Sequence, residues 1–156
     1  MAIGFGAFAR TRPVRLRKSG DPTKRRHPVT VHTDLQGLNR AVQRYFDLMY
    51  DSDTSQFDRV FCSTAQLHGF RGSEMSMLPA QAFKDAIASR PSLQSRNIPR
   101  EEQVLMVDVA SASQALVKVR VRWNTAVYLD YLTFHRIDGD WLITAKGFHI
   151  ERSDTP

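Results

Sequence analysis

The feature that most constrains the fold of this 156-residue chain is the dipeptide Asp138-Gly139, which separates two long runs of strand-forming residues. Asp-Gly is a typical two-residue loop of a β-hairpin, because both positions readily adopt positive φ. Two further runs before it are also rich in valine and leucine. The chain after Glu101 is therefore predicted to form a mainly antiparallel sheet. The four runs cover residues 104–109, 115–123, 127–137 and 140–150.

Helical patterns come before these strands. Thr33 and Gln36 form a capping-box pattern, and apolar residues then recur at three- and four-residue steps to about residue 50. We expect a second short helix at 57–61, a brief strand at 66–71, and a third helix from Pro79 that ends before residue 91. This order predicts an α+β fold in which three N-terminal helices pack on one face of a curved sheet.

The net charge of +6 is unevenly distributed along the chain. Residues 1–32 contain eight Lys/Arg and one acid, whereas the remainder contains fourteen Lys/Arg and fifteen acids. We interpret 1–32 as a basic, mostly disordered tail, 33–152 as a single domain and 153–156 as a short C-terminal tail. The basic tail has three interpretations: a poorly ordered extension, an arm that contacts nucleic acid, or a targeting peptide.

Several classes of protein are not expected. Cys62 is the single cysteine, so a disulfide framework and a Cys-rich zinc site are excluded, and a reducing, cytoplasmic location is expected. No apolar run approaches the ~18 residues that a membrane-spanning helix needs. The five histidines show no paired metal-ligand spacing, and the chain has no P-loop, G-x-G-x-x-G or G-x-S-x-G motif. We therefore expect no metal and no cofactor.

Two segments carry a resemblance to a known family: Asp130-Tyr131-Leu132, and Asp138-Gly139-Asp140-Trp141-Leu142-Ile143. Together with the helical patterns at 35–49 and 57–61, they resemble the NTF2-like superfamily of cone-shaped α+β domains. Within it, the chain is most similar to the group labelled putative lumazine-binding or SnoaL-like proteins. The resemblance covers residues 34–151 and implies dimerisation through the sheet. The superfamily includes isomerases, dehydratases, cyclases, binding subunits and transport factors, so the fold alone selects no reaction.

The expected hairpin also predicts which side chains share the face beneath the helices. With Asp138-Gly139 as the loop, Asp130 pairs with Gly147 and Tyr128 pairs with His149, and cross-strand partners project from one face. Asp130 and His149 are therefore candidate catalytic residues, as an acid–base pair. The alternatives for Asp130 are to orient a ligand or to bond its neighbours without any chemistry. Candidate ligand-binding residues are Tyr45, His68, Trp123, Tyr128 and Phe134.

The opposite face of the sheet combines apolar and basic residues. Such a mixture is typical of a protein interface, and we expect a homodimer to form there. A nucleic-acid platform is the rival interpretation, but the near-neutral charge of residues 33–156 disfavours it. The candidate interface residues are Arg120, Arg122, Leu129, Tyr131, Leu142 and Phe148.

Three hypotheses for function follow. The first is a homodimer that binds a small, partly apolar molecule in its cone. The second is a cofactor-independent isomerase, dehydratase or cyclase that uses Asp130 and His149. The third is a protein-interaction module with a filled cavity. An open pocket of about 300 Å³ or more would favour the first two. A cone closed by Trp123, Phe134 and Trp141 would favour the third. The sequence does not identify a ligand.

Overall fold

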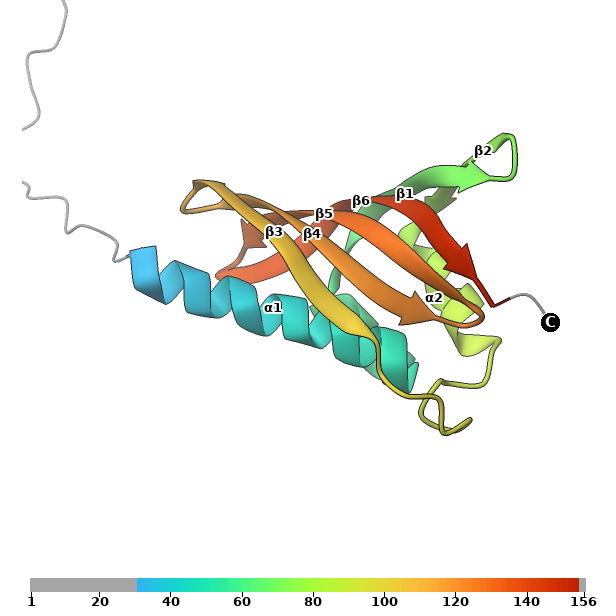
Figure 1. The fold of residues 1–156 in the computed structure, drawn as a ribbon. Helices are drawn as coiled ribbons and strands as arrows, with labels where there is room; N and C mark the ends of the chain where they lie inside the picture. The colour runs from blue at the N-terminus through green and yellow to red at the C-terminus, as the bar shows by residue number, and fades with distance from the viewer. Residues whose placement is uncertain (1–30, 155–156) are drawn as a thin grey trace, which may run out of the picture.

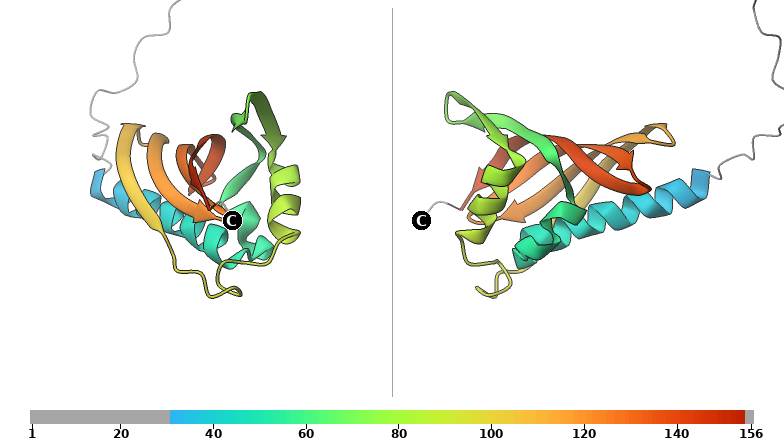
Figure 2. Two further views of the ribbon diagram at one scale, coloured as in Figure 1. Left: turned by 45° about the vertical axis from the view of Figure 1, so that its right-hand side comes forward. Right: turned by 180° about the vertical axis from the view of Figure 1, so that it is seen from behind.

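The computed structural model describes residues 31–154, with side chains from residue 35 onward. A long helix lies beneath a six-stranded sheet, and the sheet curves over it, with a second helix beside the β1–β2 edge (Figures 1 and 2). The predicted α+β architecture is confirmed. The elements are α1 (Val31–Asp51), the 3₁₀ helix η1 (Thr54–Arg59), β1 (Phe61–Arg71), β2 (Glu74–Pro79), α2 (Ala80–Ala88), β3 (Glu102–Ser111), β4 (Gln114–Trp123), β5 (Ala126–Ile137) and β6 (Asp140–Ser153).

The sheet is mixed but mainly antiparallel. Its strand order is β2-β1-β6-β5-β4-β3, and β1 and β6 form the parallel pair. The order places the first strand of the sequence next to the last one, so that the sheet is assembled across the full length of the domain. Consequently, residues from β1, β5 and β6 meet on the face of the sheet that lies toward the helices.

Helix α1 supplies the largest apolar surface from the helices. Its buried stripe follows the predicted spacing and packs on the inner face of the sheet, the face that lies toward the helices. The helix begins at Val31, so Thr33 lies inside its first turn and is not its N-cap. The predicted tail at 1–32 falls outside the described residues, apart from its last two. The stripe consists of Leu38, Ala41, Val42, Tyr45, Phe46, Leu48 and Met49.

The segment between α1 and α2 differs most from the sequence expectation. Phe61 begins β1 and does not end a helix, and β1 is longer than the predicted strand at 66–71. Gly72, at φ 62°, opens a tight turn that continues into β2, a strand that the sequence pattern did not predict. Pro79 is the N-cap of α2 in an extended conformation, so the helix begins one residue later than expected.

The hairpin predicted from Asp138-Gly139 is confirmed. Asp138 and Gly139 have φ values of 50° and 92°, and Ile137 pairs with Asp140 across them. Beneath this end of the sheet Phe134 and Trp141 are buried in the core. The core at this end of the sheet therefore contains aromatic side chains.

Candidate functional site

A β-bulge in β6 determines which residues face the cone. Phe134 pairs with Ile143 as predicted, but Thr133 pairs with Ala145, so Thr144 is an extra residue in β6. From Thr133 to Tyr128 every pairing is displaced by one residue, and a displacement of one exchanges the two faces of a strand. The predicted pairing of Asp130 with Gly147 is therefore wrong.

The displacement changes the candidate acid–base pair. Asp130 pairs with Phe148, whereas His149 pairs with Leu129 and is exposed on the outer face, the face turned away from the helices. The expected pairing of His149 with Tyr128 is wrong for the same reason, and Tyr128 pairs with Ile150. Phe148, expected at the outer face, lies on the inner face together with Asp130.

Lys146 takes the place beside Asp130 that the sequence analysis assigned to His149. The Lys146 ammonium nitrogen lies 2.8 Å from Asp130 Oδ2 and donates a hydrogen bond of 2.8 Å to the Tyr45 hydroxyl. The same Tyr45 hydroxyl donates to Asp130 Oδ2. The three side chains come from α1, β5 and β6, and all are buried, with Lys146 6% exposed and the other two 0%.

The second oxygen of the Asp130 carboxylate, Oδ1, takes no part in these contacts. Oδ1 is buried and has no hydrogen-bond partner among the described residues. Burial, followed by the negative charge of Asp130 and the hydrogen bond to it, raises the pKa of Tyr45 well above 10. Tyr45 therefore keeps its proton at neutral pH and stabilises Oδ2, not Oδ1. A buried acceptor without a partner costs about 1–3 kcal/mol, so Oδ1 requires an explanation.

Asp130 and Lys146 line a pocket between the sheet and α2. The volume in which the centre of a water-sized sphere fits is about 20 Å³. That volume holds about one water molecule, far less than the ~300 Å³ of an open ligand pocket. Besides these two residues, the pocket is lined by Leu67, Arg71, Leu78, Phe83, Trp123, Tyr128 and Phe148.

The pocket contains some of the predicted ligand-binding residues and not others. Trp123 and Tyr128 line it, and Tyr45 lies behind Asp130 and Lys146. Phe134 is fully buried in the core and is not among the lining residues. His68 pairs with Gly147 and shares the outer face with it, so it lies away from the pocket.

Sequence reasoning missed Lys146, Phe148 and Arg71. The assumed regular pairing placed Lys146 and Phe148 on the outer face, and Arg71 lies at the end of a strand expected to be short. Gly69 offered one signal, because a Cβ there would lie 2.5 Å from the Phe148 ring. A glycine inside a strand indicates a close approach of this kind, although it does not say which ring fills the space.

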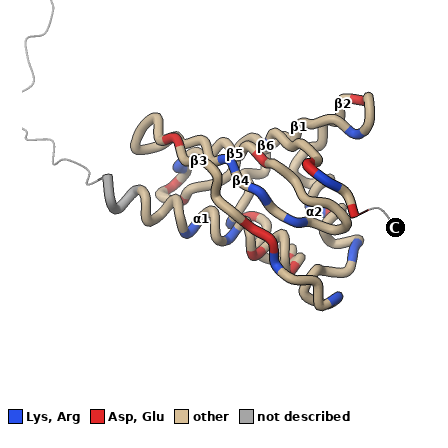
Figure 3. Tube along the Cα trace, in the orientation of Figure 1, with Lys and Arg blue, Asp and Glu red and all other residues tan. Residues whose placement is uncertain are grey.

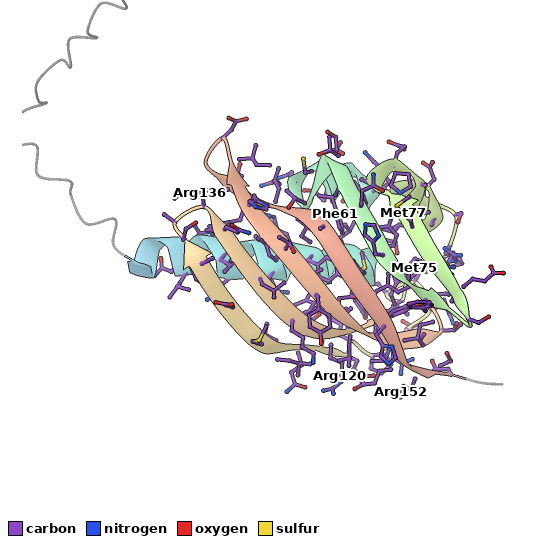
Figure 4. All side chains as sticks on the ribbon, turned by 90° about the horizontal axis from the view of Figure 1, so that it is seen from above. Phe61, Met75, Met77, Arg120, Arg136 and Arg152 are labelled. Atoms are coloured by element: carbon purple, nitrogen blue, oxygen red, sulfur yellow. The ribbon has the colours of Figure 1, made fainter. Side chains whose placement is uncertain are left out.

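The outer face is seen in Figure 4, in which the sheet lies in front of α1. Tyr131 is 41% exposed at its centre, and Phe70, Met75 and Met77 are exposed on β1 and β2. Leu129 and Leu142 are half-buried, so this face remains partly apolar without Phe148.

The two arginines predicted at the dimer interface, Arg120 and Arg122, are already paired with acids within the chain. Arg120 donates to both carboxylate oxygens of Glu151, at 2.7 and 2.8 Å. Arg122 contacts Glu101 at 3.2 Å and also pairs with Asp154. These ion pairs join β4 to the start of β3 and to the end of β6, where the charges gather at one end of the sheet (Figure 3). Within the part of the chain that the structure describes, no helix is long and apolar enough to cross a membrane.

Comparison with solved structures shows the fold. The chain is similar to an NTF2-like protein of unknown function from Silicibacter pomeroyi DSS-3, with 21% identity and a TM-score of 0.71 over 79% of this chain and 100% of that one. It is similar to another from Shewanella baltica OS155, with 16% identity and a TM-score of 0.69 over 80% and 99% of the two chains.

A ketosteroid isomerase-like protein from Erwinia carotovora atroseptica SCRI1043 is more distant, with 13% identity and a TM-score of 0.59 over 76% of this chain and 97% of that one. No curated protein matches the sequence. The sequence model of the family described as Putative lumazine-binding matches residues 33–149, which is most of the chain. The protein therefore belongs to the putative lumazine-binding family and has the NTF2-like fold.

Proposed function

We propose that the domain binds a small, partly apolar molecule through a hydrogen-bond donor that contacts Asp130. The observation that carries the proposal is the unpartnered, buried Oδ1 of Asp130 in a pocket whose other walls are mostly aromatic and aliphatic. Apolar walls with a small number of polar groups are typical of small-molecule sites. A ligand hydroxyl or N–H group would supply the missing hydrogen bond.

A ligand larger than water requires the pocket to widen. Arg71 is exposed, and Trp123, Tyr128 and Phe148 are half-buried, so the widening that we propose takes place at these side chains. Asp130, Tyr45 and Lys146 are locked by their mutual contacts and stay in place. The proposed binding therefore moves the mouth and leaves the polar end of the pocket fixed.

Native mass spectrometry of the protein after incubation with a cell extract tests this proposal. We expect the parent to retain a small molecule of defined mass and Asp130→Asn to lose it. The control is Asp58→Asn, which changes an exposed carboxylate outside the pocket. Lumazine itself, a fluorescent compound named by the family description, is a defined probe in the same assay. Equal retention by the parent and Asp130→Asn would contradict the role of Oδ1.

We propose that the domain binds a small molecule, and we assign no catalysed reaction to it. An isomerase, dehydratase or cyclase of the predicted type needs Asp130 and His149 together, and the register places them on opposite faces. No other observation selects a reaction. The third hypothesis, an interaction module, gains support from the burial of Phe134 and Trp141, two of the three residues expected to close the cone.

We also propose that a second copy of the chain covers the outer face. The support is the apolar centre around Tyr131, flanked by the exposed residues of β1 and β2 (Figure 4). Tyr131→Glu places a charge at that centre, and we expect it to shift the protein to monomer in sedimentation velocity experiments at tens of micromolar. Gln94→Glu, an exposed position in the loop after α2, is the control with the same charge change. A monomeric parent would contradict the proposal.

A further inference from the structure

Two arginines, Arg71 in the pocket lining and Arg90 beside the lining residue Trp123, have no acidic partner among the described residues. Arg71 lines the pocket, is exposed, and forms no ion pair with any carboxylate of the described residues. Its cross-strand neighbour Glu74 makes no ion pair with it either. Arg90 lies 5.1 Å from the Trp123 ring and donates to the carbonyl of Ala86, again with no carboxylate partner in the described part of the chain.

Both arginines act on the same pocket residue. Burial raises the pKa of the Tyr128 hydroxyl, and the charge of Asp130 acts in the same direction. The positive charges of Arg71 and Arg90 oppose this rise. Arg71 and Tyr128 both line the pocket, and Arg90 lies next to this wall through Trp123, whose ring centroid is 6.2 Å from that of Tyr128.

The charges within the pocket do not cancel. Asp130 is the one acid among the lining residues, and Lys146 already neutralises it through the 2.8 Å contact. Arg71 and Arg90 therefore leave an excess of positive charge at the mouth. In a partly buried site such an excess attracts an anion more strongly than it would in open water.

The distance between the two ends suits a small molecule. Gly69 and Phe148 are neighbours across β1 and β6, Phe148 and Asp130 are neighbours across β6 and β5, and Arg71 lies two residues beyond Gly69. With standard strand spacing and rise, the Cα atoms of Arg71 and Asp130 are about 12 Å apart. One ring with a short arm bridges this distance when the exposed Arg71 side chain extends outward from the pocket and not toward Asp130.

We propose that the pocket takes a small organic carboxylate, whose anionic group pairs with Arg71 and Arg90 at the mouth and whose hydroxyl donates to Asp130 Oδ1. The apolar body of this ligand lies between the walls that Leu78 and Phe148 provide. This inference rests on the proposed binding at Asp130 and adds the ionic class of the ligand. Charge-assisted hydrogen bonds from arginine to a carboxylate supply the selectivity.

Three matched probes test it by NMR titration of the full chain: 4-hydroxyphenylacetate, its neutral amide 4-hydroxyphenylacetamide, and 4-methoxyphenylacetate, which lacks the hydroxyl proton. We expect the hydroxy acid to bind at least about tenfold more tightly than either of the other two, the scale of one charge-assisted hydrogen bond. Arg71→Gln reduces the difference between acid and amide, and Arg71→Gln/Arg90→Gln removes it, because the anion pairs with both arginines. Arg96→Gln, an exposed position away from the pocket lining, leaves that difference unchanged.

Each outcome separates this inference from the proposed function. Equal binding of acid and amide overturns the carboxylate assignment and leaves a donor-binding pocket at Asp130. Equal binding of the hydroxy and methoxy acids overturns the role of Asp130 Oδ1 and leaves the arginines as the anion site. If the acid–amide difference persists in Arg71→Gln/Arg90→Gln, the anion binds elsewhere and the inference fails. Absence of binding by all three probes contradicts both proposals.

Discussion

Replacing Lys146 with methionine removes the positive charge beside Asp130 and keeps a side chain of similar length. In the parent, Lys146 contacts both Asp130 Oδ2 and the Tyr45 hydroxyl at 2.8 Å, in a place where all three side chains are buried. In Lys146→Met the carboxylate keeps the Tyr45 hydrogen bond and loses its counter-ion. Breaking a buried ion pair from one side costs about 3–5 kcal/mol, and we expect a destabilisation of that size.

The triple variant Lys146→Met/Asp130→Leu/Tyr45→Phe isolates the charges from the packing, because Tyr45→Phe removes the hydroxyl that would lose both its partners in the double variant Lys146→Met/Asp130→Leu. It removes both charges, so no ion is left buried alone, and apolar replacements of buried pairs are often neutral or stabilising. We expect its stability to lie within about 2 kcal/mol of the parent, well above that of Lys146→Met. The measurement is urea unfolding at pH 7, followed by circular dichroism at one fixed protein concentration.

The test is the order of the free energies of unfolding of these variants. If Lys146→Met unfolds within about 1 kcal/mol of the parent with an unchanged m-value, the ion pair does not hold the carboxylate in the folded state. If the triple variant is less stable than Lys146→Met, packing and not charge controls the site. Either result would also count against the proposal that Asp130, Tyr45 and Lys146 stay in place while the side chains at the mouth of the pocket move.

Two further predictions concern packing and pH. Gly69→Ala places a Cβ 2.5 Å from both the ring and the backbone oxygen of Phe148, so we expect a destabilisation of about 1–3 kcal/mol by thermal unfolding. Gly147→Ala is its control, because the nearest atom there is 3.7 Å away, and equal losses in both variants would contradict the packing argument. The hydrogen bond from Arg152, with a further contribution from Arg122, lowers the pKa of Glu101 below 4.5 in the folded protein. A depressed folded pKa gives stability that is present above the unfolded value and lost as the pH falls through the folded one, so Glu101→Gln should flatten the loss of stability below about pH 4.3. Parallel stability curves for parent and variant would show that this ion pair contributes nothing.

The features that the sequence predicted correctly depend on local signals. The buried stripe of α1 follows a helical period that stabilises the same face whatever packs on it, and Asp138-Gly139 specifies its hairpin through two residues alone. β2 escaped prediction because Glu74-Met75-Ser76-Met77 has little strand propensity, and its pairing with β1 determines its conformation. Local propensity carries no information about that partner.

Predicting which residues form the site required the pairing between strands, which local signals do not give. Asp130, Trp123 and Tyr128 were found because they lie on β4 and β5, where the pairing is regular from end to end. Lys146 and Phe148 were misplaced because the bulge at Thr144 lies between them and the hairpin loop from which the pairing was counted. Threonine has high strand propensity, so nothing in its own identity marks an extra residue.

The bulge gives β6 two alternative sets of inward-facing residues within one sequence. With Thr144 accommodated as an extra residue, Lys146 and Phe148 face the cone, whereas a regular strand would turn Gly147 and His149 inward. A single insertion or deletion near residue 144 during evolution would therefore exchange an aspartate–lysine centre for an aspartate–histidine centre without any substitution at those positions. Relatives aligned without regard to this residue would seem to share a site while presenting opposite faces of the same strand.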